Sequence, residues 1–153
     1  MKNILVPVDF SEHSNYAVEV AVDLAKKNGA TILLLHCVEL PRRFVTESTS
    51  ALPEELFFMR EAGLNVKKLS EELKEKGLTV KTVVETTALT YAVKNLLESE
   101  SVDFIVMGST GATGSKELFL GSNAEKIVRT SSVPVLVIKD KTDISKVKKL
   151  IFA

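Results

Sequence analysis

Glycine is concentrated in one short stretch of the sequence. Four of the seven glycines lie within fourteen consecutive residues, at Gly108, Gly111, Gly114 and Gly121. Glycine adopts positive φ angles without strain and lets a ligand approach the backbone closely. Ser122 and Asn123 follow directly and are expected to open a helix, whose first N–H groups and dipole attract anions. The stretch therefore predicts a phosphate site formed by main-chain amides and the Ser122 hydroxyl.

The spacing of these glycines differs from the two common phosphate-binding fingerprints. It is neither G-x-x-x-x-G-K-[ST] nor G-x-G-x-x-G, and Lys116 lacks the P-loop position, so it is interpreted as a solvated lysine. The alternative interpretation is a loop that merely turns, because loops are generally rich in glycine and serine. If the phosphate site exists, Gly121→Val should abolish binding while the fold survives, because a branched side chain would occupy the space of the phosphate.

Five other residues lie near the expected ends of strands and helices. Asp9 follows the first apolar run, where a carboxylate can bind ribose hydroxyls, ligate a metal or face solvent. Ser11 is expected to cap the following helix, and His13, in its first turn, to be a surface residue. His36 is expected to be a core histidine with a satisfied hydrogen bond. Cys37 is expected to be a small buried apolar residue rather than a nucleophile.

The composition indicates one globular domain. The 153 residues are 45% hydrophobic and 26% charged, which suffices for a single core. Twenty basic residues balance twenty acidic ones, so the chain lacks the positive field that favours nucleic acid. A single cysteine excludes an internal disulfide, and the sequence has no signal-like start and no run of eighteen apolar residues. We expect a cytoplasmic protein that binds neither nucleic acid nor membrane.

Five short apolar runs do not alternate with polar residues, which is typical of buried parallel strands. They are Ile4–Val8, Thr31–Val38, Thr79–Val84, Phe104–Met107 and Val133–Ile138. Four amphipathic stretches separate them, at Glu12–Asn28, Leu56–Leu73, Leu89–Leu97 and Leu120–Val128. The first two are followed by Gly29 and Gly77, which are typical helix stops. The alternation predicts an α/β fold, a doubly wound five-stranded parallel sheet with helices on both faces.

Two segments lie outside this alternation. Residues 39–53 are predicted to form a loop, and residues 140–153 a tail that follows a single domain at 1–139. The tail ends in Leu150-Ile151-Phe152, which is unusual apolar content for a terminus. We expect it either to dock on the domain or to contact a partner subunit, because the last strand could form an exposed sheet edge that needs cover.

Taken together, these segments resemble the universal stress protein family, in its nucleotide-binding branch. The glycine stretch fits that branch's pattern G-x2-G-x9-G-[ST], through Gly108, Gly111 and Gly121-Ser122. Matching segments at residues 4–11 (ILVPVDFS), 34–38 (LLHCV), 103–108 (DFIVMG) and 132–139 (SVPVLVIK) extend the resemblance over almost the whole chain. The resemblance implies a Rossmann-like fold of the adenine nucleotide alpha hydrolase type. It also implies ATP or AMP as the bound cofactor, with Mg²⁺ as an optional companion.

The same resemblance implies a set of nucleotide-binding residues. Asp9 would contact the ribose, and Pro7, Val8, Cys37 and Val38 would frame the adenine. The ribose and phosphates would be held by Gly108, Ser109, Thr110, Gly111, Gly121, Ser122 and Asn123. A homodimer that forms through the last strand is also expected from the family.

One segment departs from the family pattern. Many members carry Gly-x-Pro after the third strand, whereas this chain has Thr86-Thr87-Ala88. The change replaces a flexible and a rigid residue with β-branched and small ones. The loop beside the base is therefore expected to sit differently, which affects affinity and base selectivity rather than the fold.

These features favour a nucleotide-binding regulatory or stress-response protein whose dimer or partner contacts depend on the nucleotide. The sequence identifies no metal and charge arrangement for hydrolysis, so the chain is interpreted as a binder with at most slow ATP hydrolysis. One alternative is a nucleotide-free dimerising module of the same fold. Another is a receiver-type phospho-acceptor domain, which Asp9 and Lys139 resemble. That domain needs paired acids and a third-strand aspartate, whereas Val8 precedes Asp9 and Glu85 ends the third run.

Overall fold

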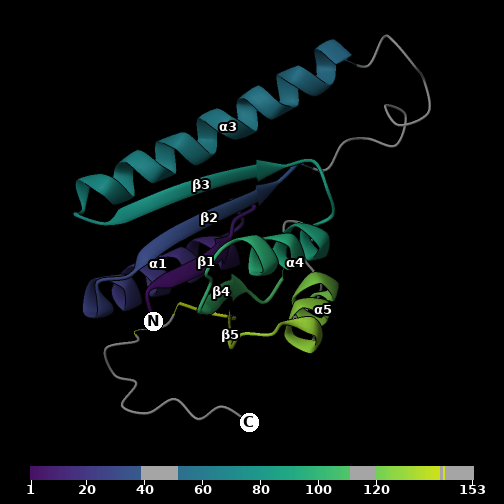
Figure 1. Ribbon diagram of the computed structural model, residues 1–153. Coiled ribbons are helices and arrows are strands. Elements are labelled where there is room, and N and C mark those ends of the chain that lie inside the picture. Colours follow the sequence, from purple (N-terminus) through teal and green to yellow (C-terminus); the bar gives the residue numbers. More distant parts are fainter. Residues whose placement is uncertain (39–51, 111–119, 142, 144–153) are drawn as a thin grey trace.

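Five parallel strands form a single sheet in the order β3-β2-β1-β4-β5 (Figure 1). The computed structural model describes residues 1–38, 52–110, 120–141 and 143, with residues 52–55 described by their backbone alone. The strands are β1 (Asn3–Pro7), β2 (Thr31–Cys37), β3 (Thr79–Glu85), β4 (Phe104–Gly108) and β5 (Val135–Ile138). Each pairing of neighbouring strands is parallel, which confirms the predicted doubly wound sheet.

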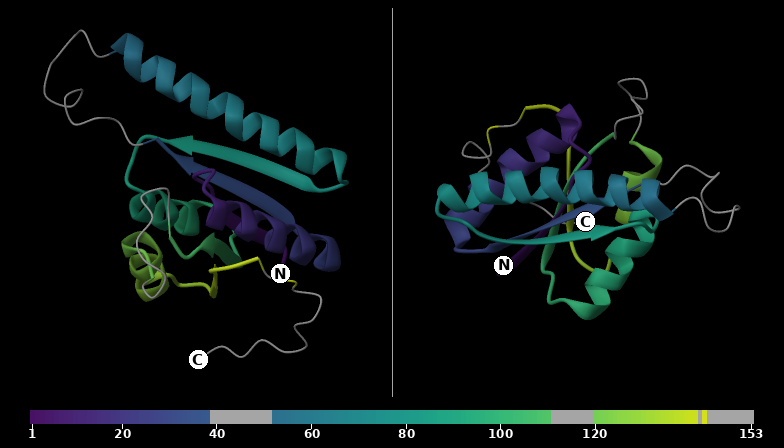
Figure 2. Two further views of the ribbon diagram at one scale, coloured as in Figure 1. Left: turned by 180° about the vertical axis from the view of Figure 1, so that it is seen from behind. Right: turned by 90° about the horizontal axis from the view of Figure 1, so that it is seen from above.

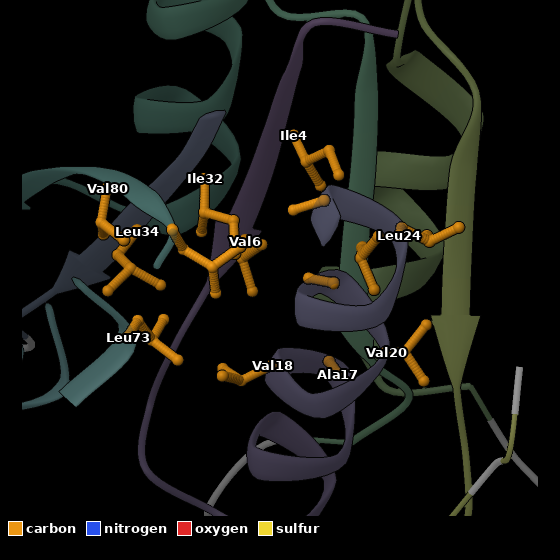
Figure 3. Close-up of a cluster of buried hydrophobic side chains, with 14 of the residues drawn as sticks. Ile4, Val6, Ala17, Val18, Val20, Leu24, Ile32, Leu34, Leu73 and Val80 are labelled. Atoms are coloured by element: carbon orange, nitrogen blue, oxygen red, sulfur yellow. The ribbon is translucent and has the colours of Figure 1, made fainter. Parts of the chain in front are cut away.

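Helices cover both faces of the sheet, as predicted (Figure 2). On one face they are α1 (Glu12–Asn28) and α3 (Leu52–Glu75), and on the other α4 (Leu89–Ser99) and α5 (Ser122–Thr130). Because side chains alternate along a strand, Ile4 and Val6 of β1 belong to the α1 core, whereas Leu5 belongs to the α4 and α5 core. Figure 3 shows the first core, in which Val18 of α1 and Leu73 of α3 approach the same strands.

The ends of α1 lie where the sequence predicted them. The Ser11 hydroxyl accepts a hydrogen bond from the Ser14 N–H at 3.3 Å and caps the first turn. Gly29 follows the last helical residue with a φ of +63°, a left-handed conformation in which a Cβ is strained. A residue that leaves the helix in this way directs the chain back toward the start of β2.

Two predicted boundaries are wrong. The loop predicted at residues 39–53 ends earlier, because α3 begins at Leu52 and Pro53 lies in its first turn, where the missing proline N–H has no helical role. The helical stripe predicted at Leu120–Val128 is shifted by two residues, because α5 runs from Ser122 to Thr130, and both Leu120 and Val128 are exposed. Only one turn of this nine-residue helix lies against the sheet.

β3 is also more exposed than its apolar run predicts. It forms one edge of the sheet, and among its first four residues only Val80 is buried. Lys81 and Thr82 face solvent. An edge strand lacks one neighbour, so a run of β-branched residues does not guarantee burial on both faces.

The sheet reverses its direction of winding between β1 and β4. The chain leaves β1 into α1 on one face and leaves β4 into α5 on the other, so the carboxyl ends of these neighbouring strands diverge. Such a switch point opens the crevice in which doubly wound proteins bind ligands. The strand order also excludes the receiver alternative, because receiver-type sheets run 2-1-3-4-5 and place β3 beside β1.

Some predictions concern residues outside the described part of the chain. These are the loop at residues 39–51, the glycines Gly111 and Gly114, and the tail from residue 144 onward. In the described part, no helix combines the length and apolar character that a membrane crossing requires.

Candidate functional site

A pocket of about 400 Å³ opens at the carboxyl ends of β1, β2 and β4. This volume is within the range of pockets that hold small-molecule cofactors. Eleven of the twelve predicted site residues line it, namely Pro7, Val8, Asp9, Cys37, Val38, Gly108, Ser109, Thr110, Gly121, Ser122 and Asn123. The twelfth, Gly111, lies outside the described residues. The topology therefore brings four distant segments of the chain to one cavity.

The pocket also contains residues that the sequence analysis did not assign to it. They are Ser14, His36, Thr87, Leu89, Met107 and Ala124. Thr87 lies between β3 and α4, and each of the others lies next to a predicted residue in sequence or in the first turn of a helix that begins at the carboxyl edge of the sheet. The signal that could have found them is topological, because every strand–helix junction at this edge faces the same crevice.

Asp9 is oriented by the backbone at the start of α1. Its Oδ1 accepts a hydrogen bond from the Ser11 N–H at 3.0 Å, and its own N–H donates to the Ser14 Oγ at 3.2 Å. Phe10 lies between these residues with a φ of +62°, which is uncommon for a side chain of this size. Strained backbone of this kind persists where surrounding contacts hold it, and it is frequent at functional sites. The carboxylate thus has a defined position at the pocket wall.

His36 joins the ends of β1 and β2. Its Nδ1 lies 2.7 Å from the Val8 carbonyl oxygen. Because that oxygen can only accept, Nδ1 is the nitrogen that donates. The hydrogen bond confirms the expected satisfied histidine. The expectation of a pure core residue was wrong, because His36 is half-buried and lines the pocket.

Gly108 is required by packing. A Cβ at this position would lie 2.9 Å from the carbonyl carbon of His13, closer than real side chains approach backbone atoms. The first turn of α1 therefore rests directly on the end of β4. His13 is half-buried rather than on the surface as predicted, and its Nδ1 lies 3.1 Å from the Thr110 Oγ1.

Gly121 supports the same junction from the other side. Its N–H donates to the Ser109 carbonyl oxygen at 2.7 Å, so this amide does not face the pocket as the sequence analysis predicted. A Cβ at Gly121 would lie 2.9 Å from that same oxygen and 3.3 Å from the Thr110 Cα. A side chain there would strike the backbone after β4 rather than fill space reserved for a phosphate. The expectation for Gly121→Val therefore had the wrong physical reason.

The amides that remain for an anion are those of the first turn of α5. Gly121 is the N-cap residue of α5 and has no side chain that could accept a hydrogen bond from the helix. The N–H groups of Ser122, Asn123 and Ala124, at the start of the helix, therefore lack partners within it. All three residues line the pocket. The described lining contains no lysine or arginine, and Asp9 is its only acidic member. In the described part of the chain no group of three metal-ligating side chains could hold a metal ion.

Comparisons with known proteins assign the chain to a family. The model of the universal stress protein family matches residues 1–139. Universal stress protein MJ0577 of Methanocaldococcus jannaschii is 30% identical over 92% of this chain and 96% of its own length. Its solved structure superposes with a TM-score of 0.82 over 93% of this chain and 98% of that chain.

One further relative agrees with this assignment, and a more distant structure shares the fold. Universal stress protein MJ0531 of the same organism is 33% identical over 90% of this chain and 82% of its own length. A universal stress protein from Archaeoglobus fulgidus, solved in complex with dAMP, has a TM-score of 0.59 and is 17% identical. The superposition covers 91% of this chain and 98% of the chain in that structure, and it supports the fold. The chain described here belongs to the universal stress protein family.

Proposed function

We propose that the pocket at the β1–β4 switch point binds an adenine nucleotide, ATP or AMP, and that the chain is a nucleotide-dependent regulatory protein. The observation that supports this most strongly is the set of three helix-start amides of Ser122, Asn123 and Ala124 on the pocket wall. Amides at a helix N-terminus bind phosphate without a basic side chain. A family relative solved in complex with dAMP supports the choice of adenine nucleotide.

The remaining lining suits the other parts of a nucleotide. Pro7, Val8 and Val38 supply apolar wall at the ends of β1 and β2, where a flat base can lie. Asp9, held by the Ser11 N–H, is an acceptor for ribose hydroxyls. Thr87 of the altered Thr86-Thr87-Ala88 segment lines the same pocket, so this departure from the family is in a position to change base selectivity.

The strength of binding follows from the number of charge-assisted hydrogen bonds. Each bond between an amide and a phosphate oxygen contributes roughly 1.5–3 kcal/mol. Three of them, reduced by the cost of association, agree with affinity of order micromolar. If Mg²⁺ accompanies the nucleotide, it would neutralise phosphate charge, and Asp9 is the carboxylate of the described lining that could approach it.

The nucleotide acts on this protein as a ligand, with at most slow hydrolysis. It can regulate only if it binds two states of the protein with different affinity. The state we propose is a homodimer formed through β5, which is the sheet edge opposite β3 and whose Val135, Leu136 and Val137 are only half-buried. An unpaired strand edge with apolar side chains readily pairs with a second copy.

The direct test is to identify the ligand carried through purification and then to titrate the emptied protein. Heat denaturation releases bound nucleotide, which mass spectrometry of the supernatant identifies. Calorimetric titration with ATP, ADP and AMP then gives the affinity, with GTP, which has the same triphosphate and a different base, as the control for base selectivity. Binding of an adenine nucleotide supports the proposal. No heat with any adenine nucleotide would overturn it and favour the nucleotide-free dimerising module.

A further inference from the structure

The N-terminal half of α3 presents apolar side chains to solvent. Leu56, Phe57, Phe58 and Leu64 have exposed fractions of 66%, 58%, 40% and 52%. Figure 1 shows this end of the helix extending past the carboxyl end of β3. Leu56 begins the apolar stripe that the sequence predicted, but its exposure shows that it is not a core residue. Single exposed apolar residues are ordinary, but four large ones within nine residues of one helix indicate a contact surface.

Phe57 and Leu64 lie on the side of α3 that faces away from the sheet. They are seven residues apart, which is close to two helical turns, so they share one face. Val66, two residues from Leu64 and therefore turned by roughly 200°, is fully buried against the sheet. The outward face is thus opposite to the packed face and independent of the domain core.

Two opposite charges lie between these apolar residues. Arg60 and Glu61 are exposed and adjacent, midway between Phe57 and Leu64. Among the side chains that the structure describes, neither forms an ion pair. The outward face therefore reads apolar, basic, acidic, apolar along the helix axis.

We propose that this face of α3 docks on α3 of a second copy of the chain, with the two helices antiparallel. A two-fold axis between residues 60 and 61 pairs Phe57 of one copy with Leu64 of the other. The same axis pairs Arg60 with Glu61 of the second copy, twice. Isologous contacts require a self-complementary surface of this kind, and helices that pack antiparallel bring such rows together.

The order of the four residues selects this arrangement over a parallel pair. In parallel helices Arg60 would face Arg60 and Glu61 would face Glu61, and like charges in contact are unfavourable. The contact is separate from the proposed β5 dimer, because α3 lies beside β3 at the other edge of the sheet. A chain that uses both surfaces forms assemblies of more than two copies.

Sedimentation velocity over a wide concentration range tests the surface. Leu64→Asp is expected to lower the weight-average mass reached at high concentration to that of the β5 dimer, whereas Tyr91→Asp, a matched change of an exposed apolar residue on α4, leaves it unchanged. Arg60→Glu should weaken association and the double change Arg60→Glu with Glu61→Arg should restore it. Circular dichroism melts verify that each variant is folded. A Leu64→Asp chain with the wild-type mass at every concentration would overturn the proposal.

Cross-linking distinguishes the orientation. In the antiparallel pair, residue 61 of each copy lies near the axis, whereas residue 72, exposed on the same helix, lies far from its counterpart. A short bismaleimide should therefore join two Glu61→Cys chains but not two Glu72→Cys chains, with the parent chain, which contains Cys37, as background. Cross-linking of both variants would indicate parallel helices, and cross-linking of neither would indicate another occupant of the face. Either result overturns the proposed pair.

Discussion

The Gly121 N–H donates to the Ser109 carbonyl oxygen at 2.7 Å, and this hydrogen bond ties the start of α5 to the end of β4. Ser109 is in turn held to the last strand, because its N–H donates to the Ile138 carbonyl oxygen at 2.8 Å. Two backbone hydrogen bonds therefore connect β4, β5 and α5 at this junction. Their effect is to hold at the pocket the first turn of α5, whose first three N–H groups lack helical partners.

Replacing Ser122 with proline tests whether those amides bind phosphate. Ser122 is the first residue of α5, where proline is tolerated, and Gly121 before it has an extended ψ of 150°, which suits a following proline. Ser122→Pro removes one N–H donor and is expected to weaken nucleotide binding by about 10- to 100-fold, the loss of one charge-assisted bond. The measurement is a calorimetric titration with ATP.

Ser122→Ala is the matched control for that experiment. It removes the hydroxyl but keeps the amide, so it measures the predicted hydroxyl contact alone, and its affinity should fall less than that of Ser122→Pro. Equal affinity of the proline and wild-type proteins would show that the amide of residue 122 does not contact the ligand.

Gly121→Ala is expected to destabilise the protein rather than simply to block a ligand. The added Cβ would lie 2.9 Å from the Ser109 oxygen, and such overpacking costs about 1–3 kcal/mol of unfolding free energy. Gly63→Ala is the matched control, because nothing lies within 4 Å of a Cβ there and the residue is inside α3. It should stabilise by about 0.5–1 kcal/mol. Urea unfolding of both variants gives the comparison, and equal shifts would contradict the close contact at Gly121.

His36 is expected to contribute to stability through the Val8 carbonyl. His36→Leu leaves this carbonyl oxygen, on a residue that is only 4% exposed, without its side-chain donor. A buried acceptor that loses its partner costs about 1–3 kcal/mol. His36→Asn keeps an N–H donor near the position of Nδ1 and should recover part of the loss. Thermal unfolding of the wild type and of both variants measures these changes. A melting temperature of His36→Leu equal to that of the wild type would mean that this hydrogen bond does not stabilise the fold.

The hydrogen bonds that Asp103 accepts predict that the protein becomes less stable in acid. The N–H groups of Lys2 and Asn3 donate to its carboxylate at 2.6 and 2.9 Å, and they lower the pKa of this group below its ordinary value of 3.8. A group whose folded pKa is depressed stabilises the fold above its unfolded pKa, and this contribution is lost as pH falls through the folded value. Asp103→Asn should therefore have a lower urea midpoint than the wild type near neutral pH. The difference between the two midpoints should become smaller below about pH 4. A difference that does not change with pH would contradict the assigned cause.

Much of the fold could be predicted from local patterns. The spacing of Ala17, Ala21 and Leu24, with the cap at Ser11 and the stop at Gly29, defined both ends of α1. The order of apolar runs and amphipathic stretches predicted a doubly wound sheet, because parallel strands need helical crossovers. The patterns failed at β3 and α5, where Lys81 and Val128 are exposed, because position at a sheet edge is a tertiary property.

The candidate site was predictable to a similar extent. Glycines and polar residues at strand ends indicated where a ligand pocket lies, since carboxyl ends of parallel strands meet at one edge. Their individual roles were not predictable. Gly108 and Gly121 are glycines because the His13 and Ser109 backbones pass within 3 Å of the missing Cβ atoms, and these neighbours are 95 and 12 residues away in sequence.

The amino-acid sequence by itself determined the order of elements, the ends of α1 and the edge of the sheet at which a ligand can bind, because each depends on residues close together in the chain. Tertiary structure alone decided which amides face the pocket, which histidine lines it and which face of α3 is left uncovered. These properties depend on how close distant segments approach, and the Gly121–Ser109 and His36–Val8 hydrogen bonds exist only once the sheet has formed.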